Sequence, residues 1–227
     1  MRTSGQRLFP FTTVMAVYRP TAFEMTDHAD IADFIDAAGP AHLVSLGGAG
    51  LIASVVPLIL DRSTNSLVGH LARPNPQWSD RDDSAEAVDA LAIFAGVDAY
   101  VSPSFYPSKH ETQRVVPTWN YEVVHAYGRL VAHDDAEWVT ALVTRLTELH
   151  EGRRSEQWSV DDTPAGYIAA MVKGIVGIEL QITRLEGKRK LSQNRRAADV
   201  DGVIEALASG SVAERETAAA MQRAQRR

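Results

Sequence analysis

The chain has 227 residues, of which 45% are hydrophobic, so it is long enough to bury one substantial core, and no Pro/Gly/Ser-rich linker or internal repeat divides it. The absence of cysteine excludes a disulfide framework, a thiolate metal site and a cysteine nucleophile, and it favours a cytoplasmic location. A formal net charge of −6 argues against a basic whole-protein footprint for nucleic acid but leaves local patches open.

Neither a membrane span nor export is expected. The longest apolar run, Leu51–Leu60, is half the length of about twenty residues that a bilayer requires, and the N-terminus has no apolar signal core. We expect residues 1–14 to be an N-terminal extension, residues 15–210 to form one domain, and residues 211–227 to form a C-terminal helix.

The first predicted elements are a helix at about Asp30–Ala38 and a hairpin. A strand at His42–Leu46, a glycine-rich turn at 47–50 and a second strand at Leu51–Leu60 give the hairpin pattern. A phosphate-cradling glycine loop would need a helix after the glycines, and the β-branched residues that follow favour a strand instead.

The next strands lead into loops. A strand at Ser66–Leu71 is followed by an acidic loop over 80–86, a long strand at Ala90–Ser102 and a loop at Pro103–Pro117. Apolar and polar residues then alternate over 121–131, and again over 178–183, which predicts two further strands.

Four helices are predicted in the remainder of the chain. Helical spacing of apolar residues predicts one at 138–149, and Thr163-Pro164 opens another that runs to about Val172. A third spans about 199–208, and a Ser211/Glu214 capping box opens the last. Antiparallel strands without regular βαβ alternation indicate an α+β, mainly β fold: an antiparallel barrel with flanking helices and a helical C-terminus.

Three segments carry the residue types of a binding site. They are Gly69–Trp78, Pro117–Tyr121 and Gly187–Arg195, and each places cations or amides beside small residues at the end of a predicted strand. This is the chemistry needed to hold a phosphate next to a planar ring. The seven histidines show no His-Glu-x-x-His spacing and there is no Gly-x-Ser-x-Gly elbow, so neither a metal centre nor a serine hydrolase is predicted.

These segments resemble the PaiB family of FMN-binding proteins, which are labelled negative transcriptional regulators. The similarity begins at Tyr18–Phe23, continues through Tyr100–Lys109 and Pro117–Leu130, and ends at Lys190–Asn194. It implies the split β-barrel of the flavin reductase and pyridoxamine-phosphate oxidase group, with FMN bound at the interface of a homodimer.

The resemblance assigns candidate FMN ligands in each segment. In the first, His70, Arg73 and Asn75 are candidates for the phosphate or ribityl chain, although a single histidine is more often a core residue. Lys109 is the candidate in the loop after the long strand.

In the second segment, Trp119 either stacks on the flavin or fills the barrel end, and Asn120 suits the pyrimidine edge. In the third, Lys188–Lys190 is usually only a solvated turn. Nevertheless, we expect Lys190, Ser192 and Gln193 to reach the same site as Arg73, either within one chain or across the dimer interface.

Three functions remain open. The first is a flavin-dependent redox or sensing protein, in which FMN exchanges electrons with a partner such as NAD(P)H. The second is an FMN-linked transcriptional regulator, although without a convincing helix-turn-helix we do not expect sequence-specific DNA binding. The third is a haem-binding or haem-degrading split barrel, with His70 or His125 as ligand.

Overall fold

A computed structural model describes residues 17–48, 50–80 and 86–226. The predicted extension over residues 1–14 lies outside the described residues. Within the described ranges, no helix is both long enough and apolar enough to cross a membrane.

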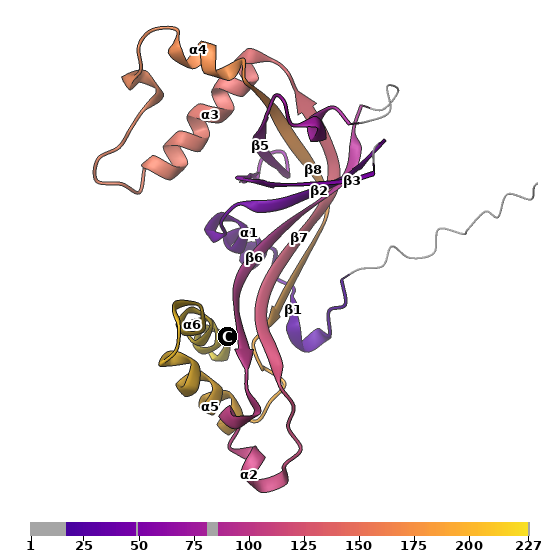
Figure 1. The fold of residues 1–227 in the computed structure, drawn as a ribbon, viewed down its shortest axis with the longest axis vertical. Coiled ribbons are helices and arrows are strands. Elements are labelled where there is room, and N and C mark those ends of the chain that lie inside the picture. Colours follow the sequence, from indigo (N-terminus) through magenta and orange to yellow (C-terminus); the bar gives the residue numbers. More distant parts are fainter. Residues whose placement is uncertain (1–16, 49, 81–85, 227) are drawn as a thin grey trace, which may run out of the picture.

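The described residues form eight strands in one antiparallel sheet, ordered β3-β2-β6-β7-β8-β5-β4, with β1 paired to the far end of β8. The strands are β1 (Glu24–Met25), β2 (Ala41–Gly47), β3 (Gly50–Val56), β4 (Ile59–Asp61), β5 (Ser66–Ala72), β6 (Val88–Val101), β7 (Thr118–His133) and β8 (Ile175–Lys190). Three of them, β6, β7 and β8, are much longer than the others, and they continue beyond the barrel as a ribbon (Figure 1).

A short 3₁₀-helix at Pro76–Trp78 follows β5 and contacts β2 and β3 on the other side of the sheet. The side chain of Asn75 accepts a hydrogen bond from the backbone of Gln77 and donates to Ser54 Oγ on β3 at 2.9 Å. The Gln77 side chain is almost fully buried and donates to the carbonyl of Leu43 at 3.0 Å and to that of Ile52 at 3.2 Å. These contacts tie the end of β5 to β2 and β3, so they hold the split barrel closed.

Helices pack against three different parts of the sheet (Figure 1). The helix α1 (His28–Ala37) packs Ile31 and Ile35 into the barrel core. At one end of the molecule, α3 (Ala136–Glu151) and α4 (Tyr167–Val172) form an arm beside β5 and β8. A side chain at Gly177 would collide with the ring of Trp138, so glycine is required there for α3 to approach β8.

The C-terminal helices α5 (Ala197–Ala208) and α6 (Val212–Gln225) pack together on the far end of β6. Both helices contribute to a second core that is separate from the barrel interior, and its members include Val203, Leu207 and Met221. The predicted capping box is present, because Ser211 accepts from the backbone of Glu214 and the Glu214 carboxylate accepts from the backbone of Ser211.

The predicted fold class and hairpin are confirmed, and each predicted helix is present, although α4 begins at Tyr167 and not at Thr163-Pro164. Three further segments differ from the prediction. Pro57 interrupts the predicted strand Leu51–Leu60, which is therefore two strands, β3 and β4. The predicted loop Pro103–Pro117 contains the short helix α2 (Ser108–Thr112). The segment Lys188–Lys190 is not a solvated turn, since it forms the end of β8 and Lys188 is buried.

Candidate functional site

Arg73 is engaged by partners within its own chain. Its guanidinium donates to both carboxylate oxygens of Asp134, at 3.0 and 2.6 Å, and also to the carbonyls of Lys173 at 2.7 Å and Ile175 at 3.1 Å. The Asp134 carboxylate raises the pKa of Arg73, and Arg73 in turn lowers the pKa of Asp134. The guanidinium therefore joins the end of β5 to the start of the arm and to the start of β8.

His70 and Asn75 lie on either side of Arg73. His70 is partly buried on β5, its Nδ1 atom has no hydrogen-bond partner within the described residues, and burial lowers its pKa, so the imidazole is neutral near pH 7. Both ends of the Asn75 amide are used in closing the barrel. Of these three predicted ligands, His70 is the one with an unused buried polar atom.

A single chain does not bring the first and third predicted segments together. Ala72 pairs with Ile175 at the start of β8, whereas Lys190 is the last residue of that strand. At about 3.3 Å per residue, the two ends of β8 lie about 50 Å apart along the strand. A site that contains both Arg73 and Lys190 would require two chains.

Asn120 and Ser192 lie in the interior, beneath α6. Asn120 is fully buried, its amide donates to Met221 Sδ at 3.3 Å, and its oxygen accepts from Ser192 Oγ at 3.1 Å. Ser192 adopts a left-handed backbone conformation with φ of 68°. These two side chains hold the end of β8 against β7 and α6.

Trp119 points to the opposite face, because consecutive residues of a strand alternate between its two sides. Trp119 is 53% exposed, and its ring lies edge-on to that of Tyr100 on β6, with the ring centroids 6.0 Å apart. The neighbours Trp119 and Asn120 therefore do not form one binding surface within a chain.

The register of the ribbon places two lysines beside the aromatic rings on this outer face. Tyr121 is opposite Lys190 and Val123 is opposite Lys188, across β7 and β8. The Nζ atom of Lys188 lies 5.1 Å from the centre of the Tyr121 ring, and that of Lys190 lies 5.9 Å from it. We call the surface formed by Tyr100, Trp119, Tyr121, Lys188 and Lys190 the aromatic–lysine face.

Neither lysine has a carboxylate partner among the described residues. Lys188 donates to the carbonyl of Tyr18 at 3.0 Å, while Lys190 donates to Thr118 Oγ1 at 2.6 Å and to the carbonyl of Trp119. Burial lowers the pKa of Lys190, and the nearby charges of Lys188 and Arg195 lower it further. An anion bound here would relieve that repulsion.

The two remaining candidates differ in their surroundings. The Gln193 amide is used locally, since it accepts from the backbone of Leu191 at 2.7 Å and donates to the carbonyl of Arg189 at 2.6 Å. Lys109 lies on α2 and its ammonium has no hydrogen-bond partner among the residues that the structure describes. Both remain predictions as FMN ligands.

Sequence reasoning did not select Tyr121 or Lys188 as site residues, nor Asp134 as the partner of Arg73. The sequence does contain a signal for Tyr121 and Lys188. If the two strands are paired, strict alternation of side chains puts Tyr121, Lys188 and Lys190 on one face. Asp134 follows β7 and has no local motif, so only the folded chain identifies it as a partner.

The residues of the aromatic–lysine face fit a flavin mononucleotide. Two cations without carboxylate partners suit the phosphate, and exposed rings suit the flavin.

An antiparallel split barrel with such a face defines the class of FMN-binding split-barrel proteins. A family model described as "Putative FMN-binding domain" matches residues 17–184. The chain therefore belongs to this family of FMN-binding proteins, which is the PaiB type, and FMN is its cofactor.

The Protease synthase and sporulation protein PAI 2 of Bacillus subtilis (strain 168) is one similar relative. It is 32% identical over 194 residues, which cover 84% of this chain and 89% of the relative.

Two solved structures share the fold at low sequence identity. The FAD and haem binding protein from Mycobacterium smegmatis has a TM-score of 0.53 and 16% identity, over 83% of this chain and 80% of that one. The flavocytochrome Anf3 from Azotobacter vinelandii has a TM-score of 0.52 and 11% identity, over 74% of this chain and 69% of that one.

Proposed function

We propose that FMN binds on the aromatic–lysine face and that the protein is a flavin-dependent redox or sensing protein. The observation that carries the proposal is the pair Lys188 and Lys190, two ammonium groups without carboxylate partners beside the Tyr121 ring. In this assignment the lysines hold the phosphate, and Trp119 and Tyr121 contact the ring system. Bound flavin supplies the capacity to accept and release electrons, while the chain supplies position and shielding from water.

We further propose that two copies associate through the outer wall of the barrel. The register aligns Val55, His42, Ile93 and His125 in one row across four strands, with a parallel row of Ala53, Val44, Leu91 and Tyr127. At the edge of this wall Leu46 is 59% exposed, Leu51 76% and Val55 63%. A largely apolar wall of this kind, with exposed aliphatic side chains at its edge, is typical of a subunit interface. The opposite wall, by contrast, is covered by α3.

The dimer is tested by placing charges on this wall. Leu51→Glu combined with Val55→Glu should leave the monomer folded, because both side chains are exposed, but should convert the dimer to monomer in light scattering at micromolar concentration. Val212→Glu is the matched control, since Val212 is 62% exposed at the start of α6, away from the wall. A wild-type chain that is monomeric at this concentration would refute the dimer.

The redox role is tested by anaerobic reduction. The purified protein with FMN should lose its flavin absorbance when NADH or NADPH is added, and should return the electrons to an added acceptor. Removal of Lys190 should slow this turnover by releasing the flavin. A protein that retains FMN but is reduced by neither nucleotide would favour sensing over redox turnover.

Regulation through DNA is the second candidate, and the contacts of the basic residues weaken it. Arg189 is paired with Glu122 and Asp30, and Arg196 is paired with Glu111. These groups do not form a free basic patch of the kind that binds phosphate backbones. Sequence-selective DNA binding retained at about 150 mM salt, where nonspecific affinity is typically weak, would support the regulator instead.

Haem binding is a third candidate because the similar protein from Mycobacterium smegmatis is named as a FAD and haem binding protein. The unpartnered Nδ1 atom of His70 is the feature of this chain that favours it. A Soret band in the purified protein that is lost in His70→Ala would support haem, and absence of that band after haem addition would exclude it.

A further inference from the structure

A pocket of about 390 Å³ lies where the chain after β8 meets the C-terminal helices α5 and α6. This volume is within the range of about 300–1,000 Å³ that is typical of small-molecule sites. One of its lining residues, Met221, accepts a hydrogen bond from Asn120, whose side chain points away from Trp119. The pocket is therefore on the inner side of the ribbon, and no residue of the aromatic–lysine face lines it.

Aliphatic side chains and one thioether form the apolar wall of this pocket. Leu191 comes from the end of the ribbon, Val200 from the first turn of α5, and Met221 and Ala224 from α6. The flexible thioether of a methionine adapts its shape to the group that it contacts. Since no aromatic ring of the described residues lines the pocket, the wall suits an aliphatic chain.

Arg195 is the one charged residue among the lining residues that the structure describes. Its guanidinium carbon lies 5.2 Å from the centre of the Tyr106 ring. Within the described ranges, the guanidinium has no hydrogen-bond partner and no carboxylate partner. The contact with the ring thus orients the cation and leaves its N–H groups free to donate. An arginine in this state can hold a carboxylate through two parallel hydrogen bonds.

The carboxylates of α5 do not pair with Arg195. Asp199 is buried, and its two oxygens accept from the backbone and the hydroxyl of Ser108, at 3.1 and 2.9 Å. Asp201 accepts from the Gln225 amide at 3.1 Å. Neither carboxylate lies within ion-pair distance of Arg195, so the arginine remains available to an added anion.

Further positive charge lies close to Arg195. The pKa of Lys190 is lowered by burial first, and then by the charges of Lys188 and Arg195. The three cations are therefore near enough to repel one another, and an anion at Arg195 would reduce that repulsion.

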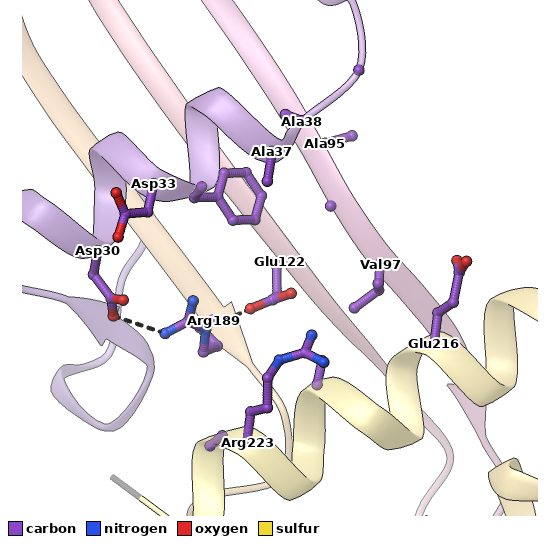
Figure 2. A pocket seen from close by; sticks show the side chains of 15 residues that line it. Asp30, Asp33, Ala37, Ala38, Ala95, Val97, Glu122, Arg189, Glu216 and Arg223 are labelled. Carbon is purple, nitrogen blue, oxygen red and sulfur yellow. Dashed lines mark hydrogen bonds and ion pairs between the residues drawn. The ribbon is translucent and has the colours of Figure 1, made fainter. Parts of the chain in front are cut away.

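The neighbouring cleft between α1 and α6 shares Ala224 with this pocket but has a different charge balance (Figure 2). Arg189 is bound there by both Asp30 and Glu122. Two further carboxylates and one further arginine line the same cleft, so no excess positive charge is left in it. An anion is therefore expected at Arg195 and not in the cleft of Figure 2.

We propose that the pocket at Arg195 binds a short aliphatic carboxylate, with its carboxylate on the guanidinium and its chain against Leu191, Val200 and Met221. The site is distinct from the aromatic–lysine face, although Leu191 directly follows Lys190. A bound ligand would thus contact the segment that carries a proposed phosphate ligand.

The test is a calorimetric titration of the chain without FMN at neutral pH, with hexanoate, acetate and hexylamine as probes. Hexanoate should bind with a dissociation constant of about 1 mM or tighter. Acetate, which lacks the chain, and hexylamine, which has the opposite charge, should bind at least about tenfold more weakly. From butanoate to hexanoate, each added methylene should strengthen binding by up to about fourfold. Because FMN is absent, the result does not depend on the proposed cofactor site.

Two variants and their matched controls locate the bound probe. Arg195→Gln should weaken hexanoate about tenfold or more by removing a charge-assisted contact, whereas Arg223→Gln, which lies outside the pocket, should not change the affinity. Ala197→Leu should block binding by filling the pocket from an exposed helical position, where leucine is well tolerated. Ala198→Leu, beside it but outside the pocket, should bind hexanoate as wild type does.

Any of three results would overturn the proposal. They are no binding of hexanoate at about 50 mM, far above the expected dissociation constant, unchanged affinity in Arg195→Gln, and binding of hexylamine or acetate that equals or exceeds that of hexanoate.

Discussion

The guanidinium of Arg73 and the carboxylate of Asp134 meet in a two-point contact, with N–O distances of 3.0 and 2.6 Å. Arg73 lies directly after β5 and Asp134 directly after β7, so the contact joins two strands that are not neighbours in the sheet. With the carbonyls of Lys173 and Ile175 also accepting from it, Arg73 fastens the arm of α3 and α4 to the barrel.

Arg73→Ala should therefore loosen the arm rather than release FMN. We expect faster amide hydrogen exchange in α4 and at the start of β8, while the FMN dissociation constant stays within about twofold of the wild-type value. Arg154→Ala is the control, because Arg154 is exposed and pairs with Glu151 of the same arm, at 3.3 Å. A large loss of FMN affinity in Arg73→Ala alone would return Arg73 to the phosphate site.

His70 should make stability depend on pH. Burial lowers its pKa below the ordinary value of 6.5, so the folded chain resists a proton that the unfolded chain accepts. The buried neutral imidazole of His70 therefore costs no free energy of unfolding above pH 6.5, its ordinary pKa. As the pH falls from 6.5 toward the lowered pKa, protonation of the unfolded chain reduces the free energy of unfolding. Denaturant unfolding across this pH range should show that the free energy of unfolding falls less in His70→Leu than in wild type.

His150→Gln is the comparison for that experiment, because His150 lies exposed near the end of α3. It should retain the wild-type pH dependence. If His70→Leu also retained it, the buried imidazole would not be its source.

Ser192 should matter for folding. Ser192→Ala leaves the buried oxygen of Asn120 without its donor, which costs about 1–3 kcal/mol of unfolding free energy. Ser192→Gly loses the same hydrogen bond but relieves the φ of 68°, so it should be the milder change. Ser209→Ala, which removes an exposed hydroxyl, should have little effect on denaturant unfolding. Equal stability of Ser192→Ala and wild type would contradict this role.

The sequence predicts the fold well because the signals are local. Alternation defines β7 and β8, the glycines of the first hairpin define its turn, and the box at Ser211 and Glu214 defines the start of α6. The face to which a residue points is harder to infer, because a one-residue change in register reverses it.

The candidate site shows this limit. The alternation over 121–131 predicts the strand that Pro117–Tyr121 leads into, and β7 begins at Thr118. Adjacency in the sequence suggests one shared surface for Trp119 and Asn120, but the two side chains point to opposite faces. Lys188 resembled a solvated turn residue because nothing local indicates that Tyr18, 170 residues away, supplies the carbonyl that accepts from it.

The FMN affinity should fall in alkaline solution because of Lys190. Burial and the charges of Lys188 and Arg195 lower the pKa of Lys190 from its ordinary value of 10.5, so the cation is lost earlier than usual as pH rises. In titrations of FMN at increasing pH, the dissociation constant of wild type should approach that of Lys190→Gln. A constant ratio between the two across the range would remove Lys190 from the phosphate contact.

The most direct test of the aromatic–lysine face is an FMN titration followed by flavin fluorescence. Wild type should quench the flavin, Trp119→Leu should reduce the quenching, and Lys190→Gln should weaken binding about ten- to a hundredfold, as expected for a charge-assisted contact of about 1.5–3 kcal/mol. Lys173→Gln, which removes an exposed lysine on the arm, should match wild type. Wild-type affinity and quenching in both Trp119→Leu and Lys190→Gln would show that FMN binds elsewhere.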